Sequence, residues 1–154
     1  MFFISCKDLM LYNQFYLLNV IAYMYLFVYG TLLSTEYNHQ TIKGSKLIGQ
    51  GSIYGKLFDI GNYPALKEGE NIIIGELYNI DDLTLKNCDQ LEGYNQDDSE
   101  NSPYIRKSVT VFLDKKELCA YVYYCNFGTK HYKEIESGNY KEYMDDKRKK
   151  SFIQ

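Results

Sequence analysis

The hydrophobic pattern of the chain is strongest in a short run that ends at a glycine. Residues 25–29 are aromatic, apolar or β-branched, Gly30 interrupts the run, and residues 34–36 are polar. This pattern predicts a buried strand followed by a tight loop and the start of a helix. A glycine allows such a loop to adopt positive φ or to approach a ligand closely, so the amides of residues 30–32 can form an anion-binding nest. A plain strand followed by a turn is the simpler interpretation of the same residues.

Glycine-rich alternation predicts the remaining strands. Residues 47–58 alternate with repeated glycines, as in a bent or bulged strand, and residues 72–78 form another strand after a loop at 62–65. Residues 105–113 and 118–125 read as a hairpin. Sheets with this many glycines tend to curl toward a barrel, so the glycine content of these strands predicts a curved sheet.

One helix is predicted before these strands and another after them. The first covers residues 36–43, with Ser34 or Thr35 as its N-cap and Gly44 at its end. The second is a charged helix that follows residues 137–139 and finishes the chain.

The clearest helix covers residues 82–92. Asp81 or Asp82 caps its start, apolar residues recur every three positions on one face, and Gly93 follows its end. Glu92 therefore lies at the negative end of the helix dipole, where Lys or Arg would be favoured. Sequences break such local rules at functional sites, and a carboxylate whose pKa is raised by the dipole and by partial burial suits a general base near neutral pH. An exposed glutamate beside a turn is the simpler interpretation.

Composition indicates one folded domain with no electrostatic preference for nucleic acid. The 154 residues are enough for a substantial core, and a hydrophobic share of 45% excludes a disordered chain. The 17 tyrosines can line a polar pocket as well as fill a core. The net charge of -3 argues against a nucleic-acid partner, and the basic residues 147–150 read as the solvated end of the last helix.

The cysteines and histidines do not predict a metal site. The chain has two histidines and four cysteines without a C-x-x-C pair, namely Cys6, Cys88, Cys119 and Cys125. This set resembles neither a zinc site nor a disulfide framework, so we expect no zinc site and a cytoplasmic location. Cys119 and Cys125 are six positions apart, which places them on one side of a strand as small core residues.

The start of the chain raises the question of a membrane segment. Residues 9–35 contain no charged side chain and are long enough for a membrane span. Because three amide side chains interrupt this stretch and its second half is needed for the first strand, we expect residues 1–23 to be an apolar N-terminal extension and residues 24–154 to be the domain. A membrane anchor through residues 1–23 is the less favoured alternative. A signal peptide is not supported, since Asp8 lies where a basic region belongs.

Six short motifs resemble, in the right order, those of γ-glutamylcyclotransferase-like proteins. They are Tyr29-Gly30-Thr31-Leu32, Tyr63-Pro64-Ala65-Leu66, Leu91-Glu92-Gly93-Tyr94, Tyr104-x-Arg106, Tyr121-Val122-Tyr123 and Ile135-x-Ser137-Gly138-x-Tyr140. Each motif is short, but six in this order are hard to obtain by chance. The resemblance runs from about Met24 to about Tyr143 and covers nearly the whole predicted domain.

The resemblance implies an α+β fold, with a small mixed β-barrel-like sheet, a few flanking helices and a pocket at one end. It implies that Glu92 is the general base and that a γ-glutamyl group binds the backbone amides of the loop Tyr29, Gly30, Thr31 and Leu32. Tyr104, Arg106 and Tyr123 are carried over as pocket or supporting residues. Arg106 fits a structural ion-pair partner equally well.

The implied activity is the release of 5-oxoproline and a free amine or amino acid from a small γ-glutamyl amide, without a metal or cofactor. A catalytically inactive domain that binds a γ-glutamyl group or another small anion is the alternative, because a fold does not guarantee activity. The acidic residues 95–102 depart from the family pattern, and the amine released stays open.

Overall fold

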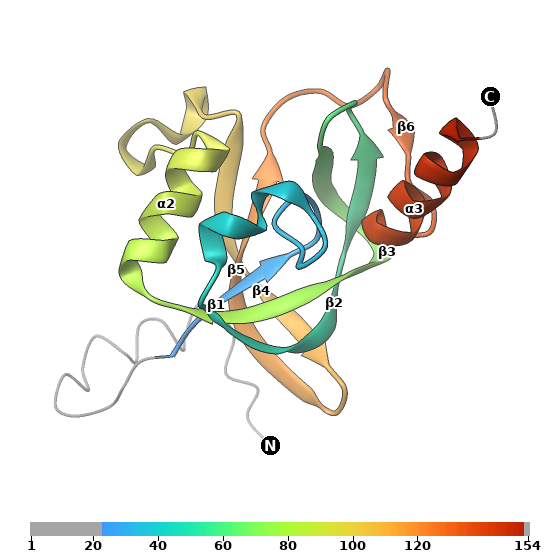
Figure 1. The fold of residues 1–154 in the computed structure, drawn as a ribbon. Helices are drawn as coiled ribbons and strands as arrows, with labels where there is room; N and C mark the ends of the chain where they lie inside the picture. The colour runs from blue at the N-terminus through green and yellow to red at the C-terminus, as the bar shows by residue number, and fades with distance from the viewer. Residues whose placement is uncertain (1–22, 153–154) are drawn as a thin grey trace, which may run out of the picture.

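The computed structural model describes residues 23–152, which fold around one mixed β-sheet (Figure 1). The sheet order is β3-β1-β5-β4-β2-β6, and β2 also pairs with β3, so strands β1 to β5 close into a barrel. The strands are β1 (Met24–Val28), β2 (Lys46–Asp59), β3 (Pro64–Ile80), β4 (Tyr104–Leu113), β5 (Lys116–Cys125) and β6 (Lys133–Glu134). The helices are α2 (Asp82–Glu92) and α3 (Tyr140–Ser151), with the 3-10 helices η1 (Tyr37–Ile42) and η2 (Gln96–Asn101). The predicted α+β, barrel-like fold is confirmed.

Strand β1 is the predicted buried strand. It pairs antiparallel with β3 along its whole length and meets β5 in parallel, with Leu26 opposite Tyr121. Leu26, Phe27 and Val28 are at most 3% exposed. Because β1 has a partner on both edges and a buried end, it provides a rigid base for the loop that begins at Tyr29.

Strands β2 and β3 are long and bent, and their pairing closes the barrel. Their register shifts near Gly49 and again near Gly55, which confirms the predicted bulged strand. The predicted loop over residues 62–65 is wrong at its end, because Pro64 and Ala65 already pair with the last residues of β2. This early pairing places Pro64 against Gly30, in the loop that follows β1.

Helix α2 has the predicted bounds and caps. The Asp81 carboxylate accepts a hydrogen bond of 2.7 Å from the backbone N–H three residues on, and Gly93 ends the helix in the left-handed region with φ 68°. Leu85 and Cys88 are buried, whereas Leu91, on the same face, is 41% exposed. Leu91 lines a cavity rather than the core, so the last turn of α2 belongs to that cavity.

The helix predicted over residues 36–43 is the 3-10 helix η1, and its predicted N-caps are wrong. Both the backbone N–H and the hydroxyl of Ser34 donate to the carboxylate of Glu76 on β3. Glu36 takes the N-cap position without a side-chain capping bond. An acceptor on a distant strand therefore decides how Ser34 is used, which a local capping rule cannot show.

The second half of the chain differs from the prediction in small elements only. Strands β4 and β5 form the predicted hairpin, and α3 begins after Asn139, whose side chain accepts from the N–H of Glu142. Residues 96–101, within the acidic stretch 95–102, form the 3-10 helix η2. Strand β6 was not predicted, because two residues are too few to show a period.

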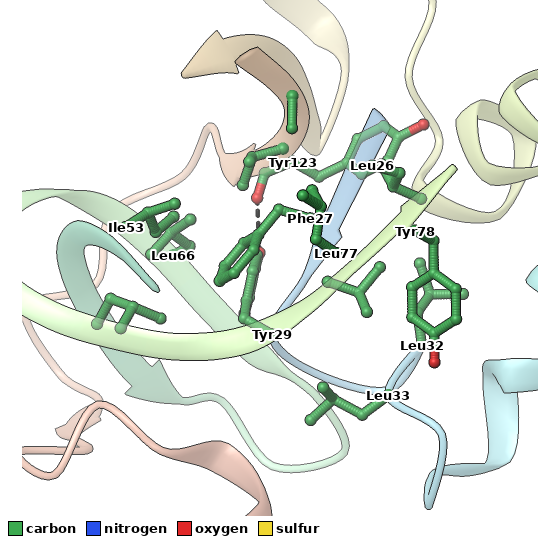
Figure 2. Packing of buried hydrophobic residues seen from close by; sticks show 14 of the residues in the cluster. Leu26, Phe27, Tyr29, Leu32, Leu33, Ile53, Leu66, Leu77, Tyr78 and Tyr123 are labelled. Atoms are coloured by element: carbon green, nitrogen blue, oxygen red, sulfur yellow. Dashed lines mark hydrogen bonds between the residues drawn. The ribbon is translucent and has the colours of Figure 1, made fainter. Parts of the chain in front are cut away.

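The core extends from the barrel into the loop after β1. Figure 2 shows Leu32 and Leu33 of that loop with Phe27 and Leu77, and all four belong to one buried cluster. The loop is thus anchored by its own apolar side chains.

Cys88 and Cys125 are free, buried thiols, while Cys6 lies outside the described residues.

The predicted extension, residues 1–23, lies outside the described residues except for Tyr23, so the domain boundary stays a prediction. Within residues 23–152, no helix is long and apolar enough to cross a membrane.

Candidate active site

A cavity of about 580 Å³ lies where β1 ends, between the loop after β1, the last turn of α2 and the first residue of β4. Seven of the eight predicted site residues line it: Tyr29, Gly30, Thr31, Leu32, Glu92, Tyr104 and Tyr123. Arg106 does not. The barrel therefore brings together residues that are up to 94 positions apart in the chain.

Glu92 is the acidic side chain that lines this cavity. Within residues 23–152 its carboxylate has neither a hydrogen-bond partner nor an ion-pair partner. Burial raises the pKa of Glu92 to about 7, because the charged form loses hydration and no neighbouring cation compensates for it. The burial part of the prediction accounts for this rise. A carboxylate in this state can accept a proton near neutral pH.

The loop facing Glu92 keeps its carbonyl groups occupied. The carbonyl of Gly30 accepts from the N–H of Leu33, that of Thr31 from the N–H of Asn38, and that of Leu32 lies 3.0 Å from Nδ1 of His39. In a trans peptide the N–H points away from the carbonyl of the same plane, so these bonds also orient the loop amides. The N–H groups of residues 30–32 have no partner in the part of the chain described, which leaves them available to an anionic ligand.

Gly30 is required by a close approach and not by its φ angle. Its φ is not positive, which corrects one of the two reasons predicted for a glycine here. A Cβ at this position would lie 2.5 Å from Cγ of Pro64, the first residue of β3. The packing partner is thus the protein itself, and Pro64 holds the loop against the start of β3.

A carboxylate that the sequence reasoning missed connects the two sides of the cavity. The hydroxyl of Tyr29 donates to the backbone carbonyl of Tyr123 at 2.6 Å (Figure 2), and the hydroxyl of Tyr123 donates to Asp89 at 2.7 Å. Burial raises the pKa of Tyr29 well above its usual value, so its hydroxyl stays protonated as a donor. Asp89 lies three residues before Glu92 on α2, and helical spacing could have placed it beside Glu92. Tyr123 therefore contacts both the binding loop and the helix that carries Glu92.

Arg106 lies behind the cavity wall, where it balances the charge of Asp89. Its guanidinium forms an ion pair with Asp89 and is stacked between the rings of Tyr94 and Tyr121, 5.1 and 4.7 Å from their centres. The contacts are those of a structural ion-pair partner, one of the two roles left open for it. Tyr104 does line the cavity, and its hydroxyl donates to the carbonyl of Pro64 at 3.1 Å.

Further lining residues had no sequence signal of their own. Tyr37 and Asn38 reach the cavity from η1, and Phe127 reaches it from beyond β5. Asn38 also donates to the hydroxyl oxygen of Thr31 at 3.0 Å, which adds a side-chain brace to the loop. Among the described residues, no group of three His, Cys, Asp or Glu side chains is arranged to hold a metal ion.

Comparison with known proteins gives a consistent result over most of the chain. Residues 26–142 match the family model described as gamma-glutamyl cyclotransferase, AIG2-like. A Methanocaldococcus jannaschii protein named provisionally as a gamma-glutamylcyclotransferase is 39% identical over 129 residues, which are 77% of this chain and 97% of that protein. The gamma-L-glutamyl-butirosin B gamma-glutamyl cyclotransferase of Niallia circulans is 45% identical over 71 residues, covering 45% of this chain but only 46% of that protein.

Solved structures show the same fold. YkqA from Bacillus subtilis superposes with a TM-score of 0.67 at 32% identity, covering 83% of this chain and 43% of that chain. An AIG2-like protein from Mus musculus has a TM-score of 0.57 at 24% identity, covering 69% and 80%, and supports the fold alone.

Proposed function

The chain belongs to the gamma-glutamyl cyclotransferase, AIG2-like family, and from this membership we propose that it converts a γ-glutamyl amide into 5-oxoproline and a free amine or amino acid. The observation that carries the proposal is the pairing, in one cavity, of a half-buried carboxylate with a loop whose amides, like that carboxylate, have no partner among the described residues. Glu92 is the proposed general base, and the amides of residues 30–32 are the proposed binding groups.

The proposed reaction is an intramolecular substitution at the γ-carbonyl carbon. Glu92 takes a proton from the α-ammonium group, and the resulting amine attacks the γ-carbonyl carbon to close a five-membered ring. The ring nitrogen then still carries one proton too many, which passes to the departing nitrogen as the C–N bond breaks, and the proton held by Glu92 is returned to the released amine. The products are the neutral ring amide of 5-oxoproline and an ammonium ion, so atoms and charge balance and no atom is added from outside.

Positioning supplies most of the rate in this scheme. Nucleophile and electrophile belong to one molecule, so the protein has to hold the γ-glutamyl chain in a folded, reactive conformer. The loop amides are suited to hold the substrate's α-carboxylate or the oxygen that becomes negative at the γ-carbonyl. The hydrogen bonds to the backbone carbonyl groups of Thr31 and Leu32 keep this loop in one orientation, which favours a preorganised site.

The test is a 5-oxoproline release assay by mass spectrometry on a panel of γ-glutamyl amino acids and γ-glutamyl amines. Glu92→Gln keeps the size of the side chain but cannot take a proton, so turnover should fall roughly 10²–10⁴-fold while the protein stays folded. A folded Gln variant with wild-type turnover would contradict the assignment of Glu92. Binding of these compounds without release from any of them would instead favour an inactive binding domain.

A further inference from the structure

A second hollow adjoins the cavity across a shared aromatic wall. It has a volume of about 480 Å³ and is formed by η1, the turn between β2 and β3, and α3. Tyr37 and Tyr63 line both spaces, and their side chains are 59% and 47% exposed. The hydroxyl of Tyr37 donates to the backbone carbonyl of Asn62 at 3.0 Å, which holds the two sides of this wall together.

The second hollow borders the cavity that holds the proposed base. Tyr37 and Tyr63 line both spaces, Glu92 lines the first and Glu36 lines the second. A group attached to a carbonyl carbon in the first space can therefore extend past these two rings into the second hollow.

A substrate of the proposed kind needs such a space. Its γ-carbonyl carbon bears both the glutamyl chain and the departing amine, so the amine has to project from the cavity that holds the glutamyl part. The rings of Tyr37 and Tyr63 offer it an apolar surface on the side of η1 and α3.

Arg148 is the charged group that this hollow offers to a ligand. The Glu36 carboxylate is only 1% exposed, and both of its oxygens accept from Nη2 of Arg148, at 3.1 and 2.9 Å. The Arg148 side chain is 46% exposed, and within residues 23–152 its one further contact runs from Nη1 to Asp145 at 3.4 Å. A guanidinium has five N–H donors, so these contacts leave some of the Arg148 donors without an acceptor in the described part of the chain. Glu36 is unavailable to a ligand, but it holds the guanidinium in place.

We propose that the second hollow holds the departing part of the substrate and that Arg148 binds a carboxylate on it. This inference rests on the proposed function and specifies its substrate class: γ-glutamyl amino acids rather than γ-glutamyl amines. Arginine suits this task because its planar fork matches a carboxylate, and a buried partner keeps the fork oriented.

The test compares two substrates that differ only by the carboxylate, γ-glutamyl-L-alanine and γ-glutamyl-ethylamine, in the 5-oxoproline release assay. The measured quantity is the ratio of their kcat/KM values, because any intrinsic difference between the two leaving groups cancels between variants. Wild type should prefer the amino acid, and Glu36→Gln/Arg148→Met should lower the ratio roughly 10- to 100-fold, as expected for loss of a charge-assisted hydrogen bond. The double variant is used because Arg148→Met alone leaves a buried carboxylate without its cation.

Lys149→Met is the matched control. Lys149 is the next residue of α3, its side chain is 76% exposed, and it does not line the hollow, so its loss changes the charge of the helix but not the proposed contact. The control should keep the wild-type ratio, whereas an equal fall would show that a general charge effect is responsible and overturn the proposal. If wild type and the double variant turn over both substrates with the same ratio of kcat/KM values, the subsite is overturned and the proposed function stands. Release from neither substrate by wild type would overturn the proposed function and this inference with it.

Discussion

Glu92 combines a position in the last turn of α2 with an environment that offers its charge no compensation. Its pKa is raised to about 7 by burial, and no Lys, Arg or His among the described residues pairs with it. At neutral pH a substantial fraction is therefore ionised and able to accept a proton. A surface glutamate would be a much weaker base at the same pH.

The pH dependence of kcat/KM should report this pKa. Only the ionised form of Glu92 can take the ammonium proton, so activity should be low at acidic pH and rise through pH about 7. The expected slope on the acid side is about tenfold per pH unit. Steady-state release of 5-oxoproline between about pH 4 and pH 8.5 checks it. An acid limb centred near pH 4.5, the value of an unburied glutamate, would count against Glu92 as the titrating base.

Tyr123 links the two halves of the site, so loss of its hydroxyl should disturb catalysis more than folding. Tyr123→Phe keeps the backbone carbonyl that accepts from Tyr29 but removes the hydrogen bond to Asp89. A hydrogen bond to a charged group contributes about 1.5 kcal/mol, and we expect kcat to fall about tenfold with little change in KM. Steady-state kinetics, together with a thermal melt, measure both quantities.

Tyr121→Phe is the control for this substitution. Tyr121 lies two residues earlier on β5, and its ring contacts Arg106, but its hydroxyl has no hydrogen-bond partner in the part of the chain described. Its variant should keep the wild-type kcat. An equal fall in kcat in the two variants would argue that β5 tolerates no change, rather than that the Tyr123 hydroxyl positions α2.

At the scale of the element, α2 is a short helix whose two ends have separate tasks. Asp81 fixes its start, and Gly93 turns the chain immediately after Glu92, packed against Pro103 at the start of the next strand. Gly93 also lines the cavity. The same residue therefore ends the helix and sets the direction in which its last side chain points.

Gly93→Ala should destabilise the protein through the end of this helix. An alanine at φ 68° is strained, and its Cβ would lie 2.9 Å from Cγ of Pro103. We expect a loss of about 1–2 kcal/mol in the free energy of unfolding, or roughly 2–8 °C in Tm. Gly128→Ala is the control, since Gly128 has no positive φ and a Cβ there would meet nothing within 4 Å. Equal Tm values for the two variants would show that the conformation of Gly93 is not required.

At the scale of the whole molecule, the ion pair between Glu36 and Arg148 joins segments 112 residues apart. It ties α3 to the start of η1, directly after the proposed binding loop. In Figure 1, α3 lies on the opposite side of the sheet from α2 in that view, so the ion pair braces the side of the molecule away from α2.

Arg148→Met should lower the stability of the protein, because it leaves the Glu36 carboxylate buried without its cation. The half-exposed guanidinium reduces the cost below that of a fully buried pair, so we expect about 2 kcal/mol, or roughly 4–8 °C in Tm. Glu36→Gln/Arg148→Met should recover more than half of this loss, since no buried charge remains. Thermal melts of wild type and the two variants measure it, and a double variant no more stable than Arg148→Met would show that the charge of Glu36 is not the cause.

The accuracy of the sequence predictions followed the range of the interactions. The strand of residues 25–28 and the bounds of α2 were predicted correctly, because their apolar periods and caps are local. The cap of η1 was not, because Ser34 bonds to Glu76 of a strand 42 residues away. Strand β3 was predicted too short, since Pro64 and Ala65 gain their strand character from pairing with β2.

The candidate site divides in the same way. Six short motifs were enough to select Glu92, the loop of residues 29–32 and the tyrosines at positions 104 and 123, and the structure gathers all of them around one cavity. The contribution of Asp89 on α2 was not predicted, because its partners, Tyr123 and Arg106, lie on strands β5 and β4.

The sequence by itself determined where β1, the hairpin of β4 and β5, and α2 run, which family the motifs resemble, and which carboxylate lies at the end of a helix, where the dipole disfavours a negative charge. These properties depend on residue type and local spacing. Only the tertiary structure decided that Glu92 is half-buried, that neither its carboxylate nor the loop amides have a partner among residues 23–152, and that a second hollow adjoins the cavity. Burial and hydrogen-bond partners depend on segments far apart in the chain, and closure of the barrel is what brings those segments together.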